Sequence, residues 1–244
     1  MLEKFSLPFK NRTLSGVFYR PDAEEFPVVI FSHGYNGYFT DFTQMCAFLA
    51  KSGVGACCFN FCGGSVRDTS GLSTTDMTIF TETEDLKAVI RYCKEQKGTE
   101  RMILFGASQG GLVSAICAEE CGEELSAMAL LFPALCIPDD CRGRALPDNT
   151  YPEEFPLWGM TLGRNFFETL RDFYVAERLG KFAKPVLIFH GDLDPVVPIS
   201  YSERAADRYP NAQLKVFKGE GHGFSEAGFR EVGDMLLEFI RRMK

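Results

Sequence analysis

A Gly-x-Ser-x-Gly turn at residues 106–110 separates an apolar run from a segment with helical spacing. Residues 101–105 are typical of a buried strand, and residues 111–118 place apolar side chains at the intervals of one helical face. Such a sharp turn holds its central residue, Ser108, in a strained conformation with the hydroxyl exposed. Glycine is required on both sides because a side chain there would collide with the adjoining strand or helix. The motif predicts a strand–turn–helix unit that displays a serine.

Strands and helices alternate along most of the remaining chain. Expected strands are 2–9, 14–20, 28–32, 55–61, 101–105, 127–132, 186–189 and 213–217. Expected helices are 42–50, 79–96, 111–118, 201–208 and a final helix ending at 241. The first two strands form a hairpin, and the inner strands are continuous apolar runs. This pattern predicts an α/β fold with a mostly parallel, twisted sheet and helices on both faces.

The alternation stops between residues 135 and 183. This segment holds four prolines and eight aromatic residues, including Trp158, the only tryptophan of the chain. A connection of this length between two strands is usually a functional lid or a small inserted subdomain. We therefore expect a core made of residues 1–134 and 184–244, with residues 135–183 inserted as a lid.

Composition narrows the class of protein. The chain has 244 residues, of which 45% are hydrophobic and 24% charged, and this is ordinary for one globular domain. The net charge of −7 argues against nucleic acid or an anionic membrane as a partner. No apolar run reaches the ~18 residues of a membrane span, and the N-terminal residues lack a signal-peptide core. A cytoplasmic protein is expected.

The nine cysteines are odd in number and show no framework spacing. Cys57, Cys58, Cys93 and Cys117 fall inside expected strands and helices, which favours buried free thiols in a reducing compartment. With only three histidines and no ligand spacing, neither a metal site nor a cofactor is expected.

A serine hydroxyl becomes an effective nucleophile only when a base takes its proton. His33 precedes the turn, and His190 ends a strand expected inside the sheet. His222 lies in a glycine-rich loop between the last strand and the last helix, where its imidazole has the freedom to reach Ser108. His222 is therefore the predicted base.

The carboxylate that orients the base is expected between the serine and the histidine in the chain. Residues 190–198 contain two candidates just after a strand. Asp194 lies further into the loop and is followed by a proline, so it is the predicted orienting group. Asp192 is the alternative and more typical of a turn or capping residue.

A tetrahedral intermediate requires hydrogen-bond donors directed at its oxyanion. The backbone N–H of Gln109, the residue after the serine, is one predicted donor. The loop after an earlier strand supplies the second, for which the N–H of Tyr35 is predicted. His33 is then expected to shape that loop.

Together these motifs resemble the α/β-hydrolase superfamily over essentially the whole chain. The matching elements are His33-Gly34, Gly106-x-Ser108-x-Gly110, His190-Gly-x-x-Asp194 and Gly221-His222. The resemblance implies the α/β-hydrolase fold, with the residues above as catalytic triad and oxyanion hole.

More narrowly, the chain is similar to the bacterial cinnamoyl (feruloyl) esterases. The similarity lies in Asp76-Met77-Thr78 leading into Thr83-Glu84-Asp85, in the short lid and in its opening Pro133-Ala134. In that family a lid aspartate binds the phenolic hydroxyls of the substrate, and Asp140 stands at the matching place. The chain departs from the family where a lid tyrosine shares this task, because Phe166 stands there.

Other lid residues have two interpretations. Phe155, Trp158, Phe166 and Phe167 are expected mainly to pack the lid on the core, with one or two free to stack on a flat acyl group. Trp158 and Phe166 are the two predicted to bind substrate, together with Asp140. Arg142 and Arg144 are expected at solvent-exposed positions.

The resulting hypothesis is a serine carboxylesterase acting through an acyl-enzyme on hydroxycinnamoyl or other small esters. An aminopeptidase or acylpeptidase is the alternative enzyme, since one fold serves many substrates. Glu153 and Glu154 are the lid carboxylates that keep this alternative open. A non-catalytic binding protein on the same scaffold is a third hypothesis. The expected partner is a small ester, and a homodimer is left open.

Overall fold

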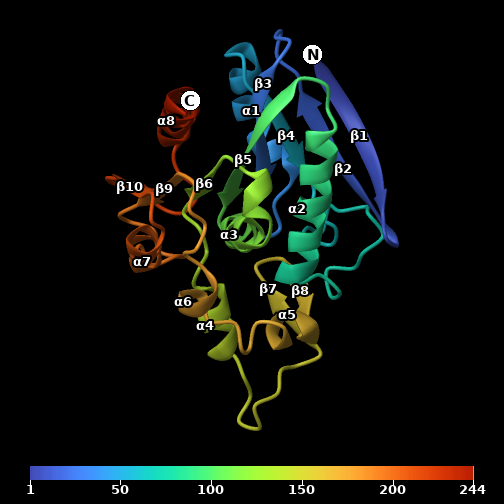
Figure 1. Ribbon diagram of the computed structural model, residues 1–244. Coiled ribbons are helices and arrows are strands. Elements are labelled where there is room, and N and C mark those ends of the chain that lie inside the picture. Colours follow the sequence, from blue (N-terminus) through green and yellow to red (C-terminus); the bar gives the residue numbers. More distant parts are fainter. Residues whose placement is uncertain (244) are drawn as a thin grey trace.

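The centre of the molecule is an eight-stranded sheet with the strand order β1-β2-β4-β3-β5-β6-β9-β10 (Figure 1). The computed structural model describes residues 1–243. The strands are β1 (Leu2–Phe9), β2 (Arg12–Tyr19), β3 (Phe26–Ser32), β4 (Gly55–Phe59), β5 (Thr99–Ala107), β6 (Ala127–Leu131), β9 (Val186–Gly191) and β10 (Ala212–Phe217). All strands from β4 to β10 in this order are parallel, whereas β2 is antiparallel to both β1 and β4. The predicted mostly parallel sheet is confirmed.

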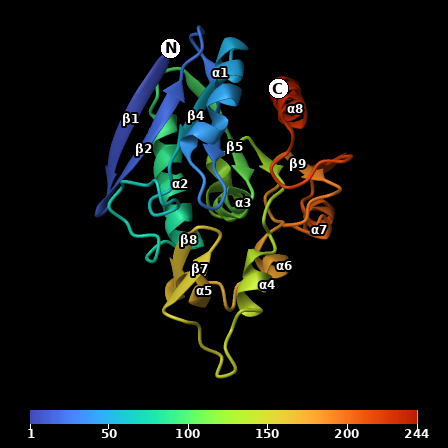
Figure 2. The same ribbon diagram turned by 180° about the vertical axis from the view of Figure 1, so that it is seen from behind.

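Helices cover both faces of this sheet (Figures 1 and 2). One face carries α1 (Thr43–Lys51), preceded by the 3₁₀ turn η1 (Phe39–Phe42), and α8 (Glu226–Arg242). The other face carries α2 (Ile79–Lys94), α3 (Gln109–Cys121) with its 3₁₀ extension η2 (Gly122–Glu124), and α7 (Ser200–Arg208). Each set of helices buries its apolar side chains against the sheet, so the protein has one hydrophobic core on each side.

Helix α3 differs from its expected pattern. Its sequence spacing suggests one apolar face, yet all of residues 109–118 are buried. The sheet lies on one side of α3, α2 packs on another, and Pro133 lies against Gly111. The predicted helix and its apolar face are therefore present, and the rest of these turns is buried as well because neighbouring elements pack around them.

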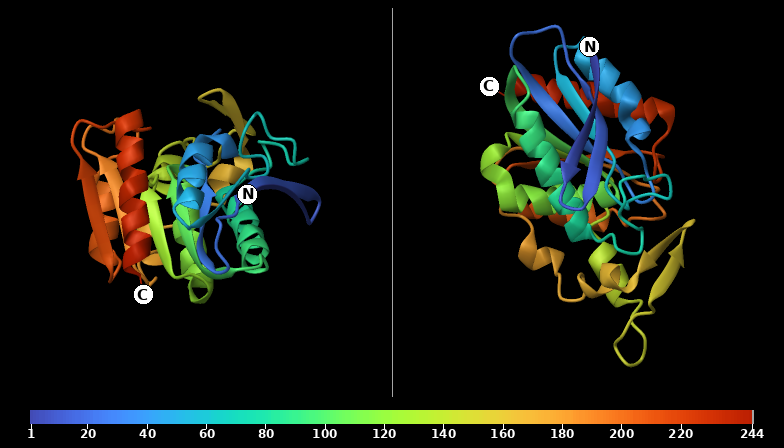
Figure 3. Two further views of the ribbon diagram at one scale, coloured as in Figure 1. Left: turned by 90° about the horizontal axis from the view of Figure 1, so that it is seen from above. Right: turned by 90° about the vertical axis from the view of Figure 1, so that its right-hand side faces the viewer.

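The segment between β6 and β9 lies outside the large sheet, at one end of the molecule (Figures 1 and 3). It contains α4 (Ile137–Arg142), β7 (Glu154–Leu157), β8 (Met160–Gly163), α5 (Arg164–Glu168) and α6 (Val175–Arg178). The small sheet formed by β7 and β8 was not expected from the sequence. Its hairpin turn is Trp158-Gly159, and both residues have positive φ angles of 41° and 80°. A two-residue turn with two positive φ angles matches the twist of a hairpin.

Most element boundaries agree with the sequence expectations to within a few residues. The expected helix 42–50 begins earlier, as η1, and the strand expected to reach residue 61 ends at Phe59. The Asn60 side chain accepts the backbone N–H of Phe39 at 2.8 Å, so Asn60 links the two connections at this end of the sheet. No helix within residues 1–243 is both long and apolar enough to cross a lipid bilayer.

Candidate active site

Ser108 stands at the junction of β5 and α3 in a strained backbone conformation, with φ 52° and ψ −120°. Residues other than glycine rarely adopt such angles. A Cβ atom on Gly106 would lie 2.3 Å from the carbonyl oxygen of Gly110, and one on Gly110 would lie 2.3 Å from that of Ser32. The expected collision at both glycines is therefore confirmed, and the motif is a nucleophile elbow in geometry.

Three side chains that are distant in sequence meet at this elbow. The Ser108 Oγ lies 3.0 Å from His222 Nε2, across 114 residues of sequence. The Nδ1 of the same imidazole lies 2.8 Å from Asp194 Oδ2. When Nδ1–H donates to this carboxylate, Nε2 is left unprotonated and accepts the hydroxyl proton of the serine. This is the geometry that a serine nucleophile and its base require.

Asp194 is held rigidly, with 1% of its side chain exposed. Its Oδ1 accepts the backbone N–H groups of Val196 at 2.8 Å and Val197 at 2.9 Å, while Oδ2 lies 2.8 Å from His222 Nδ1 and 3.3 Å from His190 Nε2. These donors satisfy the buried carboxylate and orient it toward the imidazole.

Asp192, the alternative carboxylate, has a different partner. Its Oδ1 accepts the backbone N–H of Gly219 at 2.6 Å. Gly219 belongs to the glycine-rich loop that carries His222, so Asp192 shapes the loop without contacting the imidazole.

The two remaining histidines are buried and hydrogen-bonded to the protein. His33 accepts the N–H of Phe61 through Nε2 at 3.1 Å and donates from Nδ1 to the carbonyl of Gly34 at 2.8 Å. His190 bonds Ser202 and the carbonyl of Val197. Burial lowers the pKa of both imidazoles, so both are neutral and structural. Within residues 1–243 no three His, Cys, Asp or Glu side chains are grouped to share a metal ion.

The two residues predicted to supply the oxyanion donors lie at the same cavity as Ser108. Tyr35 and Gln109 both line it. Gln109 is the first residue of α3, where an N–H has no partner within the helix. The hydroxyl of Tyr35 donates to the carbonyl of Leu157 at 2.8 Å, which fixes the loop of Tyr35 to the lid hairpin. Both N–H groups are therefore candidates for an oxyanion hole.

The cavity beside Ser108 is small, about 70 Å³, and is roofed by the lid. All three lid residues singled out for substrate binding line it: Asp140, Trp158 and Phe166. Phe166 is 3% exposed and belongs to the wall, whereas Trp158 is 68% exposed and stands at the rim. The ring of Trp158 meets that of Tyr35 edge to face.

The lid arginines are less exposed than expected. Arg142 is half-buried, pairs with Asp139 and donates to the carbonyl of Phe173 at 2.9 Å. Arg144 is also half-buried and lines the cavity beside Ser108. Assigning both to solvent was wrong, because the folded lid packs their long side chains against itself.

A buried acid beside the elbow was missed in the sequence. Glu82 of α2 is fully buried, and its Oε2 accepts the side-chain N–H of Gln109 at 2.9 Å. Burial raises the pKa of Glu82 to about 8, although the bond from Gln109 opposes this shift. One signal could have found it: Glu82 precedes Leu86 by four residues and so extends the apolar stripe of α2.

Replacing Glu82 with glutamine is expected to change how stability depends on pH. Because the folded protein holds this proton more tightly than the unfolded chain, the stabilisation is complete below pH 4.5 and is lost as the pH rises to about 8. In this pH range the free energy of unfolding of the wild type should fall by up to about 1.4 kcal/mol per pH unit because of Glu82. Glu82→Gln removes that loss, which urea unfolding at several pH values measures.

The two proteins should be compared above about pH 6. Burial raises the pKa of Asp85 to about 6, so at lower pH the titration of Asp85 also changes the stability of both proteins. Glu84→Gln, at a half-buried neighbouring position that pairs with Lys10, is the control and should keep the wild-type slope. Equal slopes in wild type and Glu82→Gln would contradict a buried, proton-bound Glu82.

Comparison with known protein families decides the class of this chain. A family model described as serine aminopeptidase, S33, matches residues 23–171, more than half of the sequence. The chain belongs to this α/β-hydrolase family. A second model, described as alpha/beta hydrolase fold, matches residues 159–228, which include Asp194 and His222.

Solved structures agree over the full length of this α/β hydrolase. Est1E from Butyrivibrio proteoclasticus, in a structure with bound ferulic acid, has 26% sequence identity and a TM-score of 0.90. The match covers 98% of both chains. A second structure of Est1E has 25% identity and a TM-score of 0.87.

Curated relatives match only in part. The non-heme chloroperoxidase CPO-A1 from Kitasatospora aureofaciens is 45% identical over 69 residues, which is 27% of this chain and 25% of the chloroperoxidase. A non-heme haloperoxidase from Rhodococcus erythropolis is 46% identical over 57 residues, or 21% of its length. These short matches cover about a quarter of the relatives, so they do not carry over a whole-protein activity.

Proposed function

We propose that this α/β hydrolase is a serine carboxylesterase that cleaves hydroxycinnamoyl or other small aryl and acyl esters. The observation that carries the proposal is the hydrogen-bonded series from Asp194 through His222 to Ser108, at a cavity roofed by the lid. The overall similarity to Est1E, seen with ferulic acid bound, supports the choice of acyl group.

The reaction has two stages. The Ser108 Oγ attacks the ester carbonyl while its proton passes to His222 Nε2, and the N–H groups of Tyr35 and Gln109 stabilise the oxyanion. The intermediate collapses when the C–O bond to the alcohol breaks and His222 gives its proton to the leaving oxygen. A water molecule then attacks the acyl-enzyme, with His222 again taking and returning a proton, which releases the acid.

The lid supplies the acyl pocket in this proposal. Asp140 accepts a hydrogen bond from a phenolic hydroxyl, Phe166 packs against the aromatic ring, and Trp158 covers the entrance. At about 70 Å³ the cavity is well below the ~300 Å³ of ordinary ligand pockets. Binding therefore requires the exposed parts of the lid to move outward.

A substrate panel tests this function. We expect methyl ferulate to be hydrolysed with a kcat/KM above that of an alanyl arylamide by a factor of at least about 10², since Glu153 and Glu154, the lid carboxylates considered for a peptide amine, do not line the cavity beside Ser108. Steady-state kinetics on both substrates measures this. Faster turnover of the arylamide would favour a serine aminopeptidase, the activity in the family description.

The variant Asp140→Ala tests recognition of the phenolic hydroxyl without changing the catalytic residues. Asp140→Ala should lower kcat/KM for methyl ferulate by about 10-fold or more, the effect of losing one hydrogen bond to a charged group. Methyl cinnamate, which lacks the hydroxyl, serves as the matched control and should be almost unaffected. Equal losses on both substrates would remove Asp140 from phenol recognition.

The aminopeptidase alternative has little support in the lid. Glu153 pairs with Arg164 at 2.8 Å, Glu154 begins β7, and neither lines the cavity beside Ser108. A non-catalytic binding protein is the third alternative, and the failure of a fluorophosphonate probe to label Ser108 would favour it.

A further inference from the structure

The last turn of α3 brings two cysteines into contact. The Sγ atoms of Cys117 and Cys121 lie 3.3 Å apart, and residues four apart in a helix share one face. A disulfide would bring them about 1.3 Å closer, to the ~2.05 Å of an S–S bond. The helical rise over four residues is about 6 Å, which falls within the Cα separations of disulfides.

The backbone at this point permits the small adjustment. Cys121 ends α3 with φ −131° and ψ 30°, outside helical geometry, and Gly122 follows it. The regular helical backbone therefore ends at Cys121. Closing the bond must bring the two Cβ atoms from the ~5–6 Å of helical neighbours to the ~3.5–4.5 Å of a disulfide, and the irregular backbone at Cys121 is the place where this shift would be taken up.

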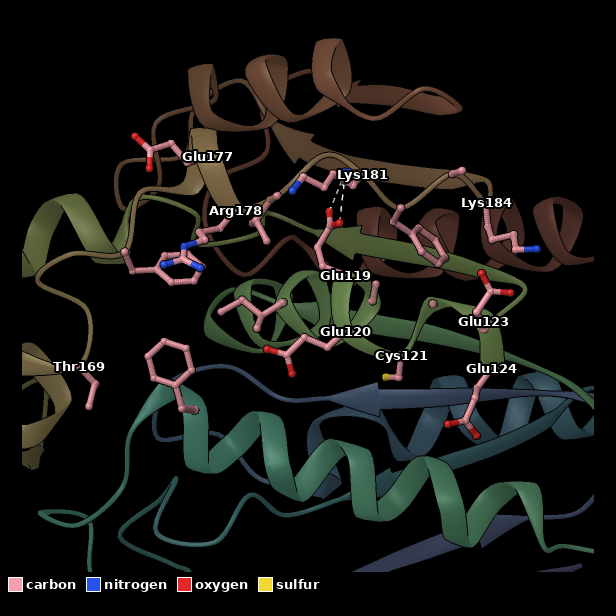
Figure 4. Close-up of a pocket in the computed structure, with 18 of the residues that line it drawn as sticks. Glu119, Glu120, Cys121, Glu123, Glu124, Thr169, Glu177, Arg178, Lys181 and Lys184 are labelled. Atoms are coloured by element: carbon pink, nitrogen blue, oxygen red, sulfur yellow. Dashed lines mark hydrogen bonds between the residues drawn. The ribbon is translucent and has the colours of Figure 1, made fainter.

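Access distinguishes Cys121 from the other thiols. Of the nine cysteines, all within the described residues, Cys121 is the only one that is not buried. It lines a hollow of about 1020 Å³ between the end of α3 and the segment that leads into β9 (Figure 4). Cys117 is fully buried beside it, so Cys121 is the more accessible cysteine of the pair.

The hollow carries more negative than positive charge. Its walls include six carboxylates and three cationic side chains: Glu119, Glu120, Glu123, Glu124, Asp172 and Glu177, with Arg178, Lys181 and Lys184. Lys87 pairs with Glu120 and Lys94 with Glu124, so two of these carboxylates are neutralised, and the hollow is open to a small neutral oxidant.

The two thiols share their protons unequally. A hydrogen bond from the Cys117 thiol, aided by the ammonium of Lys87, lowers the pKa of Cys121, although burial, Glu120 and Glu124 oppose this. The same shared proton raises the pKa of Cys117. The carbonyl of Cys117, 2.9 Å from the Cys121 sulfur, accepts the S–H while Cys121 is protonated. Cys121 is also the less buried of the two cysteines, so it is the sulfur that an incoming oxidant reaches first.

We propose that Cys121 is a peroxide-reactive thiol and Cys117 its resolving partner, so that the end of α3 forms a reversible disulfide. The Cys121 thiolate attacks one oxygen of hydrogen peroxide, the O–O bond breaks, and the departing hydroxide becomes water with the proton that Cys121 released. The sulfur of Cys117 then attacks the sulfenic acid, the S–O bond breaks, and hydroxide leaves with the Cys117 proton as water. Two thiols are oxidised by two electrons, and one peroxide is reduced to two waters.

The test uses the full chain with hydrogen peroxide at stoichiometric amounts. We expect the intact mass to fall by two hydrogen atoms and a non-reducing peptide map to show a Cys117–Cys121 link, reversed by dithiothreitol. Cys117→Ser should stop at a sulfenic acid that dimedone traps on Cys121. Cys121→Ser should lose the reaction at this site completely.

Two further proteins complete the experiment. Cys46→Ala removes a buried thiol far from α3 and should form the link as the wild type does. Ser108→Ala should also be oxidised normally, because the reaction does not use the hydrolase site. Recovery of both α3 cysteines as free thiols, or oxidation spread evenly over the nine cysteines, would overturn the proposal.

Discussion

Replacing Ser108 with alanine is expected to lower kcat on methyl ferulate by at least about 10⁴-fold, because Ser108 carries the hydroxyl that contacts the base His222. The hydroxyl lies 3.0 Å from His222 Nε2, so its removal leaves the base without a nucleophile to activate. Hydrolysis of methyl ferulate and of p-nitrophenyl esters measures the loss, and labelling by a fluorophosphonate should disappear with it.

Ser6→Ala is the matched control, since Ser6 is an exposed residue of β1. It should retain wild-type activity and labelling. If the Ser108→Ala protein still turned over esters at the wild-type rate, the nucleophile would have to lie elsewhere, and the mechanism proposed for this site would be refuted.

The second large effect is expected for Asp194→Asn, with a fall in kcat of about 10⁴-fold. The carboxylate accepts a hydrogen bond from His222 Nδ1–H at 2.8 Å and so keeps Nε2 free to act as a base. An asparagine amide that donated to Nδ1 would select the other tautomer, in which Nε2 carries the proton and cannot accept the serine hydroxyl. Steady-state kinetics measures the loss.

Asp192→Asn provides the comparison. Asparagine retains an oxygen that accepts the N–H of Gly219, so turnover should stay within a few-fold of wild type and stability should fall by about 1 kcal/mol at most. Thermal unfolding and kinetics on the same samples measure both quantities. A large loss in Asp192→Asn with little loss in Asp194→Asn would reassign the orienting role.

Much of the fold was predictable because its signals are local and strong. β3 and β4 are continuous apolar runs, as expected for strands covered on both faces, and the stripe of α2 follows helical spacing. The β7–β8 hairpin was missed because each strand has four residues and Pro156 weakens the pattern of the first. In the structure the hairpin is marked by the turn at Trp158-Gly159, where two residues with positive φ angles reverse the chain.

The sequence does not predict which lid side chains are buried and which are exposed. Their composition predicts an aromatic lid, yet Phe166 is buried in the cavity wall while Trp158 is largely exposed at the rim. Arg144 turns to the cavity, whereas Arg142 is held by Asp139. Such differences depend on how neighbouring segments pack, which no local pattern contains.

The sequence by itself determined the elbow around Ser108 and the sheet that presents it, because steric exclusion at Gly106 and Gly110 and the burial of apolar runs act over short stretches of chain. Only the tertiary structure decided that His222, 114 residues away, reaches Ser108 and that Asp194 rather than Asp192 reaches His222. It also placed the acid of Glu82 beside Gln109 and the sulfur of Cys121 against Cys117. Distances of this kind follow from the packing of complete elements on both faces of the sheet, and a single residue shift in register would change them.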